Sequence, residues 1–400
     1  MMRLSAYLAI MLLLLSCSGQ KQQEKGTEIP LSYAKLLKIY DCGDHRRVEI
    51  FDPWNTDRIL HEYTIPTLDD NLDVDHDANL DLDSATANNP QPTTNNHSLI
   101  STTATHAWLL NELGARQCIA GLCDKDYVVS PFARDIPDCG RSQNPDIEKI
   151  VTLQPTAIIV SPFHNSGGYG KMEQLGIEII EAADYMETTP LARAEWMIFY
   201  GMLVGKEQEA RALFKQIEEK YKNVLNVSES SDGSDGSDGY DGYESSEGSE
   251  GSDNQQPTTN YQQPKIMTDL QVVSAWYVPG GNSTTAHYIA DAGGSYAFAN
   301  NKDSGSIPVS FETMLQKNLN ADIWMIKYNA KTDLTLSQMR QDKEGYAQFR
   351  AYKMQRVYGC NTAKNNYFEV APWRPDIILQ EYRHIINQAD DSLVYFRRLK

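Results

Sequence analysis

The chain has 400 residues, of which 41% are hydrophobic and 10% aromatic, a composition that excludes a mostly disordered protein and allows one large domain or two ordinary ones. The formal net charge is −18, but residues 69–83 and 228–253 hold seven and nine of the acids with no Lys or Arg. The rest of the chain is therefore nearly neutral, and without a basic footprint we expect no binding to nucleic acid.

The N-terminus has the pattern of an export signal. Arg3 precedes a short apolar run that is too short to span a bilayer stably. The segment Leu14-Leu-Ser-Cys17 is similar to a bacterial lipobox, although a plain signal peptide with an incidental cysteine is the alternative. We therefore expect a lipoprotein signal peptide over residues 1–17, a lipid on Cys17, and a tether over residues 18–30 that leaves the protein anchored to a membrane on its periplasmic side.

Five further cysteines follow. Outside the cytoplasm a disulfide is permitted, and an odd count leaves at least one thiol unpaired. The Cys-x4-Cys spacing has no neighbouring histidine, so we expect no zinc site. Buried thiols or a single bridge are both open for Cys42, Cys118, Cys123, Cys139 and Cys360.

Residues 31–188 are predicted to form an N-terminal α/β lobe, because strands and helices alternate along most of it. Short strands are expected at 33–40, 47–51 and 58–63. Farther along, the apolar spacing predicts helices at 105–113 and 145–153 and buried strands at 157–162 and 176–180.

Two polar, acidic inserts interrupt the chain, at 67–98 and 228–264. The alternating acids of the first invite a calcium-loop interpretation, but Ala78 and Ser84 stand where an EF-hand has glycine and glutamate. The second is rich in Asp, Gly and Ser and has too little apolar surface to offset its ordering entropy. Solvated inserts are the preferred interpretation of both.

A long helical pattern over 189–206 is predicted to connect the two halves, and residues 207–400 are predicted to form a C-terminal α/β lobe that begins with a second helix. Later elements are expected as strands at 266–278, 321–326 and 356–358 and helices at 286–292, from 309, and at 375–387. Two similar lobes joined by one helix predict a ligand cleft between them.

The halves also share a local order of helix, turn and buried strand, at Pro145–Ser161 and at Val309–Ile326. Residues 144–160 (NPDIEKIVTLQPTAIIV) resemble a signature of the ABC-importer substrate-binding lipoproteins for ferric siderophores, haem and cobalamin, the Fe/cobalamin periplasmic-binding domain. Thr156 departs from that signature, where Asp is usual. The resemblance covers roughly 100–225 and 265–387.

This resemblance implies a two-lobed fold, no catalysis, no cofactor and no resident metal. The implied partners are an iron-siderophore ligand, with cobalamin second and haem third, and the transmembrane subunits of an ABC permease; we expect a monomer. Glu148 and Glu312 match the family positions that pair with permease arginines. Each is otherwise explained as a first-turn acid favoured by the helix dipole.

Loops at strand ends are expected to line the cleft, where flat aromatic rings can stack on a chelate and arginine can pair with anionic groups. Trp276 and Trp373 are equally well explained as packing residues, and direct metal ligation by His164 or His287 is not favoured. The candidate ligand-binding residues are Phe132, Arg134, Ser161, Phe163, Tyr169, Trp276, Tyr277, Tyr328, Trp373 and Arg374.

Two other classes of protein agree less well with the sequence. An enzyme on a similar fold would need a nucleophile–base pair or a cofactor motif, and the sequence has no GxSxG, P-loop, HExxH or strand-linked GxGxxG. A calcium-dependent adhesion lipoprotein would depend on the acidic tracts, so deleting them distinguishes it from a ligand-capturing protein.

Overall fold

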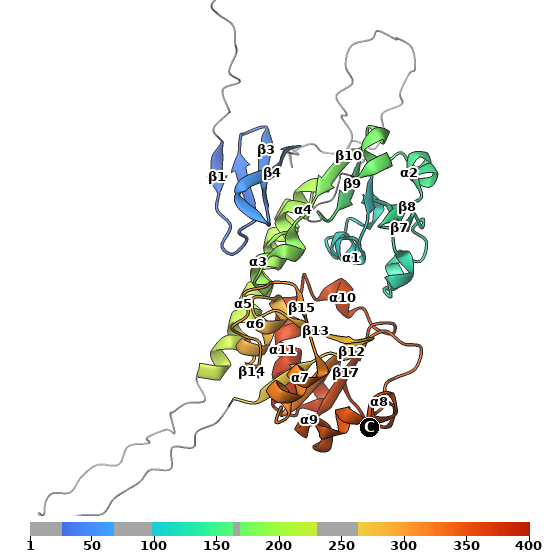
Figure 1. Ribbon diagram of the computed structural model, residues 1–400. Coiled ribbons are helices and arrows are strands. Elements are labelled where there is room, and N and C mark those ends of the chain that lie inside the picture. The colour runs from blue at the N-terminus through green and yellow to red at the C-terminus, as the bar shows by residue number, and fades with distance from the viewer. Residues whose placement is uncertain (1–25, 68–97, 163–168, 230–262) are drawn as a thin grey trace, which may run out of the picture.

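The computed structural model describes residues 26–67, 98–162, 169–229 and 263–400. Cys17, Phe163 and almost all of both acidic tracts lie outside these ranges. The described chain forms an added N-terminal sheet and two α/β lobes, coloured blue, green to teal, and orange in Figure 1.

The N-terminal sheet consists of four antiparallel strands in the order β1-β2-β3-β4. Its alternation follows the sequence, since Leu37 and Ile39 are buried while Lys38 between them is exposed. Three of the strands overlap those predicted between 33 and 63. The bounds are β1 Thr27–Ile29, β2 Leu37–Asp41, β3 His45–Asp52 and β4 Asn55–Pro66.

Buried carboxylates attach this sheet to the rest of the molecule. Glu195 accepts the backbone N–H groups of residues 32–34 at 2.7–2.8 Å, and Glu187 accepts those of residues 35 and 36 at 2.8 and 2.9 Å. Tyr63 of β4 donates to the carbonyl of Ile179 at 3.2 Å. The sheet is thus separate from the parallel sheet of the lobe to which the sequence assigned it.

The N-terminal lobe is built on a parallel sheet in the order β10-β9-β5-β6. All four residues of β9 are buried, as expected for a parallel strand covered on both faces. Asp146 caps α2 by accepting the N–H of Lys149 at 3.1 Å. The bounds are β5 Leu99–Ser101, α1 Ala104–Glu112, β6 Ile119–Leu122, β7 Gly140–Arg141, β8 Asn144–Pro145, α2 Ile147–Leu153, β9 Ala157–Val160 and β10 Glu178–Glu181.

The segment between the lobes differs in detail from the single predicted helix. It divides at Trp196 into α3 (Pro190–Glu195) and α4 (Met197–Leu203), and the chain then turns back into α5 (Glu207–Glu229). A Cβ on Gly201 would lie 2.6 Å from the carbonyl oxygen of Lys206, so glycine permits the close packing of α4 and α5. Helix α5 packs against both α4 and α11 of the C-terminal lobe (Figure 1).

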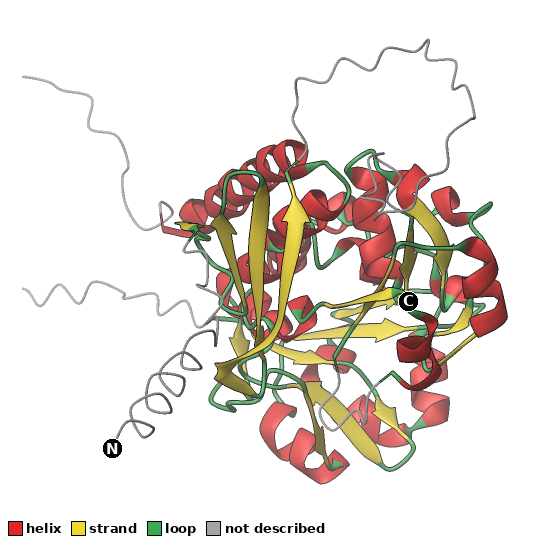
Figure 2. Cartoon of the chain, turned by 90° about the horizontal axis from the view of Figure 1, so that it is seen from above, coloured by secondary structure: helices red, strands yellow, loops and turns green. Residues whose placement is uncertain are grey.

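The C-terminal lobe contains a five-stranded sheet in the order β14-β11-β16-β17-β18, and a smaller sheet β12-β13-β15. Figure 2 shows the molecule from above, with helices around its strands. The strands are β11 Lys265–Thr268, β12 Gln271–Val272, β13 Ala275–Pro279, β14 Ser295–Tyr296, β15 Ser306–Val309, β16 Ile323–Tyr328, β17 Val357–Asn361 and β18 Arg397–Arg398. The helices are α6 Thr284–Asp291, α7 Phe311–Asn318, α8 Leu336–Asp342, α9 Arg350–Lys353, α10 Tyr367–Val370 and α11 Pro375–Ile386.

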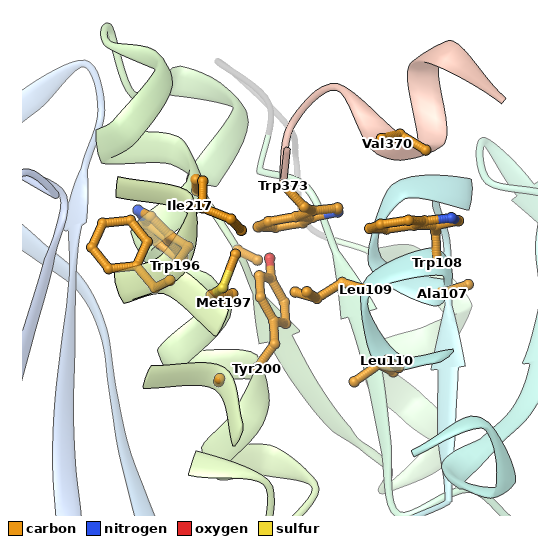
Figure 3. Close-up of a cluster of buried hydrophobic side chains, with 14 of the residues drawn as sticks. Ala107, Trp108, Leu109, Leu110, Trp196, Met197, Tyr200, Ile217, Val370 and Trp373 are labelled. Atoms are coloured by element: carbon orange, nitrogen blue, oxygen red, sulfur yellow. The ribbon is translucent and has the colours of Figure 1, made fainter. Parts of the chain in front are cut away.

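One hydrophobic core runs from the N-terminal sheet through both lobes. Trp373 of the C-terminal lobe lies among Tyr200, Ile217 and Trp108, which come from the connecting helices and from α1 (Figure 3). The ring centroids of Trp373 and Tyr200 are 5.4 Å apart in an edge-to-face arrangement. The two lobes therefore share buried apolar surface in addition to their covalent connection.

Candidate functional site

The first candidate cavity lies at the carboxyl ends of strands in the N-terminal lobe and has a volume of about 840 Å³. Thr102 follows β5 and Ser161 follows β9, while the β7–β8 hairpin and the start of α2 form another wall. Open α/β sheets bind ligands at this edge, and the volume is in the usual range for small-molecule sites. We call this space the N-lobe cavity; Ser161 and Tyr169, both predicted ligand residues, line it.

The side chain of Tyr169 is held by Glu181, which is held in turn by His61. Its hydroxyl donates to the carboxylate of Glu181, which is also paired with His61 of the added sheet. Burial and Glu181 raise the pKa of Tyr169. Burial alone would raise the pKa of Glu181, but His61 and Tyr169 lower it, and Glu181 in turn raises the pKa of His61. The N-terminal sheet thereby reaches the wall of the N-lobe cavity.

A second space, the interlobe cavity, has a volume of about 190 Å³ and is lined from both lobes and from α3. Thr105 comes from α1, Arg193 from α3, and Lys327 from the end of β16. The ammonium of Lys327 lies 3.3 Å from Asp269; burial would lower its pKa, but this carboxylate raises it. The interlobe cavity therefore combines two cationic side chains with groups from both sides of the lobe boundary.

A buried polar network lies behind Arg193. The carboxylate of Asp184 is 2.9 Å from both His106 Nε2 and the Tyr200 hydroxyl, and 3.2 Å from Arg193 Nε. His106 Nδ1 is 2.9 Å from the hydroxyl of Thr103, which lines the N-lobe cavity. Burial alone would raise the pKa of Asp184, but His106, Arg193 and Tyr200 lower it. The network connects the walls of the two cavities.

Helix α10 attaches the C-terminal lobe directly to the N-terminal lobe. The carboxylate of Glu369 accepts the N–H groups of Val129 and Ser130 at 2.7 and 3.2 Å. The indole of Trp373 donates to the carbonyl of Thr105 at 2.7 Å. These bonds lie beside the interlobe cavity and hold its two sides together.

Two predicted ligand residues are corrected by the structure. Trp276 is fully buried, stacks on Trp324 at 5.6 Å, and donates from its indole to the carbonyl of Thr268. Trp373 is also fully buried at the lobe boundary. A ring enclosed on both faces by protein offers no face to a ligand, so packing, the alternative explanation given for both, is their role.

The other predicted ligand residues are dispersed. The guanidinium of Arg374 forms two bonds with Asp376, at 2.9 and 2.8 Å, and Phe132 packs against the main core. Arg134 is exposed and Tyr277 is half exposed on β13. None of these four lines either cavity. Tyr328 lines a different space of about 420 Å³ in the C-terminal lobe, and Phe163 lies outside the described residues.

The two predicted docking carboxylates occupy equivalent positions. Glu148 is exposed in the first turn of α2, and Glu312 is exposed in the first turn of α7. Each helix has a side-chain cap, from Asp146 and Ser310. Backbone N–H groups and the Ser310 hydroxyl lower the pKa of Glu312. Both carboxylates are thus accessible to a partner, and Glu148 also lines the N-lobe cavity.

Sequence reasoning missed Arg193, Thr102 and Thr105. Arg193 lies inside a predicted helix, where an arginine is ordinarily solvated, and only the packing of the lobes shows that it faces a cavity. Thr102 follows the three-residue strand β5, which is too short to give an apolar pattern. Lys327 directly precedes the predicted ligand residue Tyr328, and it lines the interlobe cavity.

The five cysteines of the described chain are free thiols, and four of them are buried. Burial raises the pKa of Cys123 to about 12 and that of Cys360 to about 11. Such thiols are poor nucleophiles and pack as small apolar groups. This outcome corresponds to the buried-thiol alternative for these residues.

The arrangement of two α/β lobes around these cavities has counterparts among known proteins. A family model described as periplasmic binding protein matches residues 99–234 and 252–364, more than half of the chain. The chain belongs to the periplasmic binding protein family. The match begins after the N-terminal sheet, so this sheet is additional to the matched region.

The relatives of this periplasmic binding protein include two uncharacterised lipoproteins of Methanocaldococcus jannaschii. They are 27% and 20% identical over 66% and 68% of this chain. The chain spans only 55% and 65% of the length of these relatives.

Solved structures share the fold. A periplasmic haem-binding protein from Pseudomonas aeruginosa has a TM-score of 0.54 at 14% identity, covering 76% of this chain and 98% of that one. A protein described as part of an ABC-type Fe3+-hydroxamate transport system from Saccharomonospora viridis has a TM-score of 0.51 at 13% identity, covering 73% and 93%. The predicted two-lobed α/β fold and the family resemblance are confirmed.

Proposed function

We propose that this protein is the substrate-binding lipoprotein of an ABC importer and that it captures a ferric siderophore. The observation that carries the proposal is the N-lobe cavity, at the strand ends of a two-lobed periplasmic binding protein. Its volume of about 840 Å³ suits a chelate better than a single amino acid or ion. Cobalamin and haem remain the alternative ligands, and haem is supported by a solved haem-binding protein of this fold.

Glu148 and Glu312 are proposed to dock the loaded protein on the permease. Their support is that one exposed carboxylate stands in the first turn of a helix on each lobe. Arginine side chains of a partner can bond such carboxylates in a bidentate manner, which fixes orientation as well as adding affinity. Two such points, one per lobe, define how the whole molecule sits on its partner.

Anchoring through Cys17 on the periplasmic side of a membrane completes the proposal. Its support is the lipobox-like segment and the naming of both relatives as lipoproteins. No helix in the described ranges is long and apolar enough to cross a bilayer. The protein is proposed to act as a monomer without a cofactor and to perform no chemistry on its ligand.

Thermal-shift titration of the full-length chain in detergent tests the ligand. The panel is ferric hydroxamate and catecholate siderophores, cyanocobalamin and haem. A ligand that binds only the native state stabilises it by RT ln(1 + [L]/Kd), so one class raises the melting temperature in a saturable manner. We expect a ferric siderophore to do so.

Tyr169→Phe provides the matched variant, because it removes the hydroxyl that holds the ring to Glu181 and keeps the ring in the cavity lining. It should weaken the shift, whereas Tyr127→Phe, at an exposed tyrosine outside the cavity lining, should leave it unchanged. A shift with cyanocobalamin or haem alone would replace the siderophore by that ligand. If the saturable shift in melting temperature is the same in wild type, in Tyr169→Phe and in other variants of the N-lobe cavity, the ligand binds elsewhere.

A further inference from the structure

The N-terminal sheet lies outside the region that matches the family model, yet one of its side chains connects to the wall of the N-lobe cavity. The match begins at residue 99, whereas β4 ends at Pro66. His61 of β4 is paired with Glu181 of β10, and Glu181 accepts a hydrogen bond from the hydroxyl of Tyr169. Tyr169 lines the N-lobe cavity. Three side chains therefore join an added element to the candidate ligand site.

Alternate residues of β4 hold the strand β10. His61 and Tyr63 are two positions apart, so both point to one face of their strand, and their ring centroids lie 5.7 Å apart in a stacked arrangement. The Tyr63 hydroxyl donates to the carbonyl of Ile179 at 3.2 Å and accepts the N–H of Glu181 at 2.9 Å. Strand β10 is at the edge of the N-lobe sheet, so these bonds take the place of a neighbouring strand. The backbone of Glu181 is thus fixed, and its carboxylate is directed by the side chains that pair with it.

The ring of Tyr169 depends on Glu181 for its position. Glu173 accepts the backbone N–H of Tyr169 at 2.6 Å, which fixes the main chain but not the ring. The Tyr169 hydroxyl bonds Oε1 of Glu181, whereas His61 pairs with Oε2 of the same carboxylate. The side chain of Glu181 is only 9% exposed, but that of His61 is 44% exposed. The bond that directs the ring is therefore shielded from water, while the imidazole can exchange protons with solvent.

Negative charge surrounds the imidazole of His61. The ionisable groups described around it are acidic or phenolic: Glu181 and Glu178 of β10, Tyr63 of β4, and Tyr169 across the Glu181 carboxylate. The hydrogen bond with Glu181 raises the pKa of His61, and burial offsets only part of this effect. Below the raised value the pair with Glu181 is charge-assisted, and as pH rises through that value the imidazole becomes neutral and the pair weakens.

We propose that His61 is a positioning residue for ligand capture, which holds the ring of Tyr169 in the wall of the N-lobe cavity through the carboxylate of Glu181. A ring that is ordered before the ligand arrives loses less conformational entropy on binding, so the charged pair favours a higher affinity. The cavity is therefore prepared for tighter binding at mildly acidic pH than at alkaline pH. This effect on affinity rests on the proposed function, whereas the link from His61 to Tyr169 does not.

Calorimetric titration of the full-length chain with a ferric hydroxamate siderophore, at about pH 6 and about pH 8.5, tests the effect on affinity. Wild type should bind about threefold more tightly at the lower pH, the effect of strengthening one hydrogen bond. His61→Gln should bind with the weaker affinity at both pH values, and His61→Arg, which stays cationic, with the tighter affinity at both. His45→Gln removes a histidine of the same sheet that lies 2.7 Å from Asp44, and it should keep the wild-type pH difference. A wild-type difference that persists in His61→Gln would overturn the proposal.

The link from His61 to Tyr169 is measured without a ligand, by NMR of the full-length chain in detergent with 13C-labelled tyrosine rings. The Tyr169 signal, assigned with Tyr169→Phe, should shift with pH at the midpoint at which His61 titrates, and His61→Gln should abolish this shift. A Tyr169 signal that does not change over this titration would overturn the proposal even if siderophore binds. A Tyr169 signal that responds in a chain that binds no siderophore would support the link while rejecting the proposed function.

Discussion

At the residue scale, the buried carboxylates have structural roles that the local sequence does not predict. Asp184 is fully buried, and its carboxylate is hydrogen-bonded to His106, Tyr200 and Arg193. A buried charge is tolerated only when it is paired and hydrogen-bonded, and removing one partner leaves the others uncompensated. The network therefore depends on each of its members.

Asp184→Asn should lower the free energy of unfolding by about 3 kcal/mol, because Arg193 and His106 lose their buried anion. Since the folded state lowers the pKa of Asp184, its contribution is present above the unfolded value of roughly 3.9 and is lost as pH falls through the lower folded value. Urea denaturation between pH 3 and 7 measures both effects. Asp57→Asn, at an exposed aspartate, is the control, and equal losses from the two substitutions would contradict the account.

His61 should give the opposite pH dependence. Glu181 raises the pKa of His61 in the folded state, so its stabilising contribution is complete below the ordinary value of roughly 6.5 and is lost as pH rises through the raised value. The difference in unfolding free energy between wild type and His61→Gln should therefore be larger at acidic than at alkaline pH. A difference that is constant with pH would show that the pairing with Glu181 has no energetic effect.

At the element scale, the N-terminal sheet is attached by a few specific bonds. The single carboxylate of Glu195 satisfies three backbone N–H groups in residues 32–34. Hydrogen bonds to charged acceptors are stronger than neutral ones, and unsatisfied buried donors are costly. Glu195 therefore provides the largest number of these bonds, beside those of Glu187 and Tyr63 and the shared apolar core.

Glu195→Gln should loosen the sheet, since an amide cannot accept at both ends. We expect a loss of about 2 kcal/mol in the free energy that holds this segment, and faster trypsin cleavage at Lys35 and Lys38, with the lobes intact. Mass spectrometry of the fragments locates the cuts. Glu28→Gln, at an exposed glutamate of β1, should leave cleavage unchanged; the idea fails if both variants are cut at the wild-type rate.

Local pattern was enough to predict most elements. The short apolar runs at 157–162 and 321–326 and the helical spacing at 375–387 predict β9, β16 and α11 to within about two residues at each end. The site was predicted less well. Trp276 lies in β13 and Trp373 lies between α10 and α11, and only tertiary packing shows that other side chains enclose both rings. Arg193 and Lys327 line the same cavity although they are 134 positions apart in the sequence, and no local pattern predicts this.

At the scale of the whole molecule, the lobes are joined by more than one link. Helix α5 packs on both α4 and α11, Glu369 bonds the N-terminal lobe, and one apolar core crosses the boundary. Such links oppose a wide hinge motion and favour small relative shifts of the lobes. The distance between a contact point on one lobe and a contact point on the other is therefore nearly fixed when a partner binds both.

The docking proposal is tested by the double variant Glu148→Ala, Glu312→Ala. Ligand uptake by cells that express the importer should fall, because each loss weakens association with the permease by about tenfold or more. Ligand affinity in solution should fall by much less. The double variant Glu219→Ala, Glu344→Ala removes two other exposed carboxylates and should transport normally; normal uptake by the docking variant would exclude these two contacts.

Isothermal titration calorimetry of the full-length chain with ferric siderophores tests the central claim most directly. We expect one ligand per chain, with affinity reduced by substitutions at Ser161 and Tyr169 in the N-lobe cavity. The contrary result is the absence of binding heat at several temperatures for ferric siderophores, cyanocobalamin and haem in a folded sample. That result would contradict the proposed role in ligand capture.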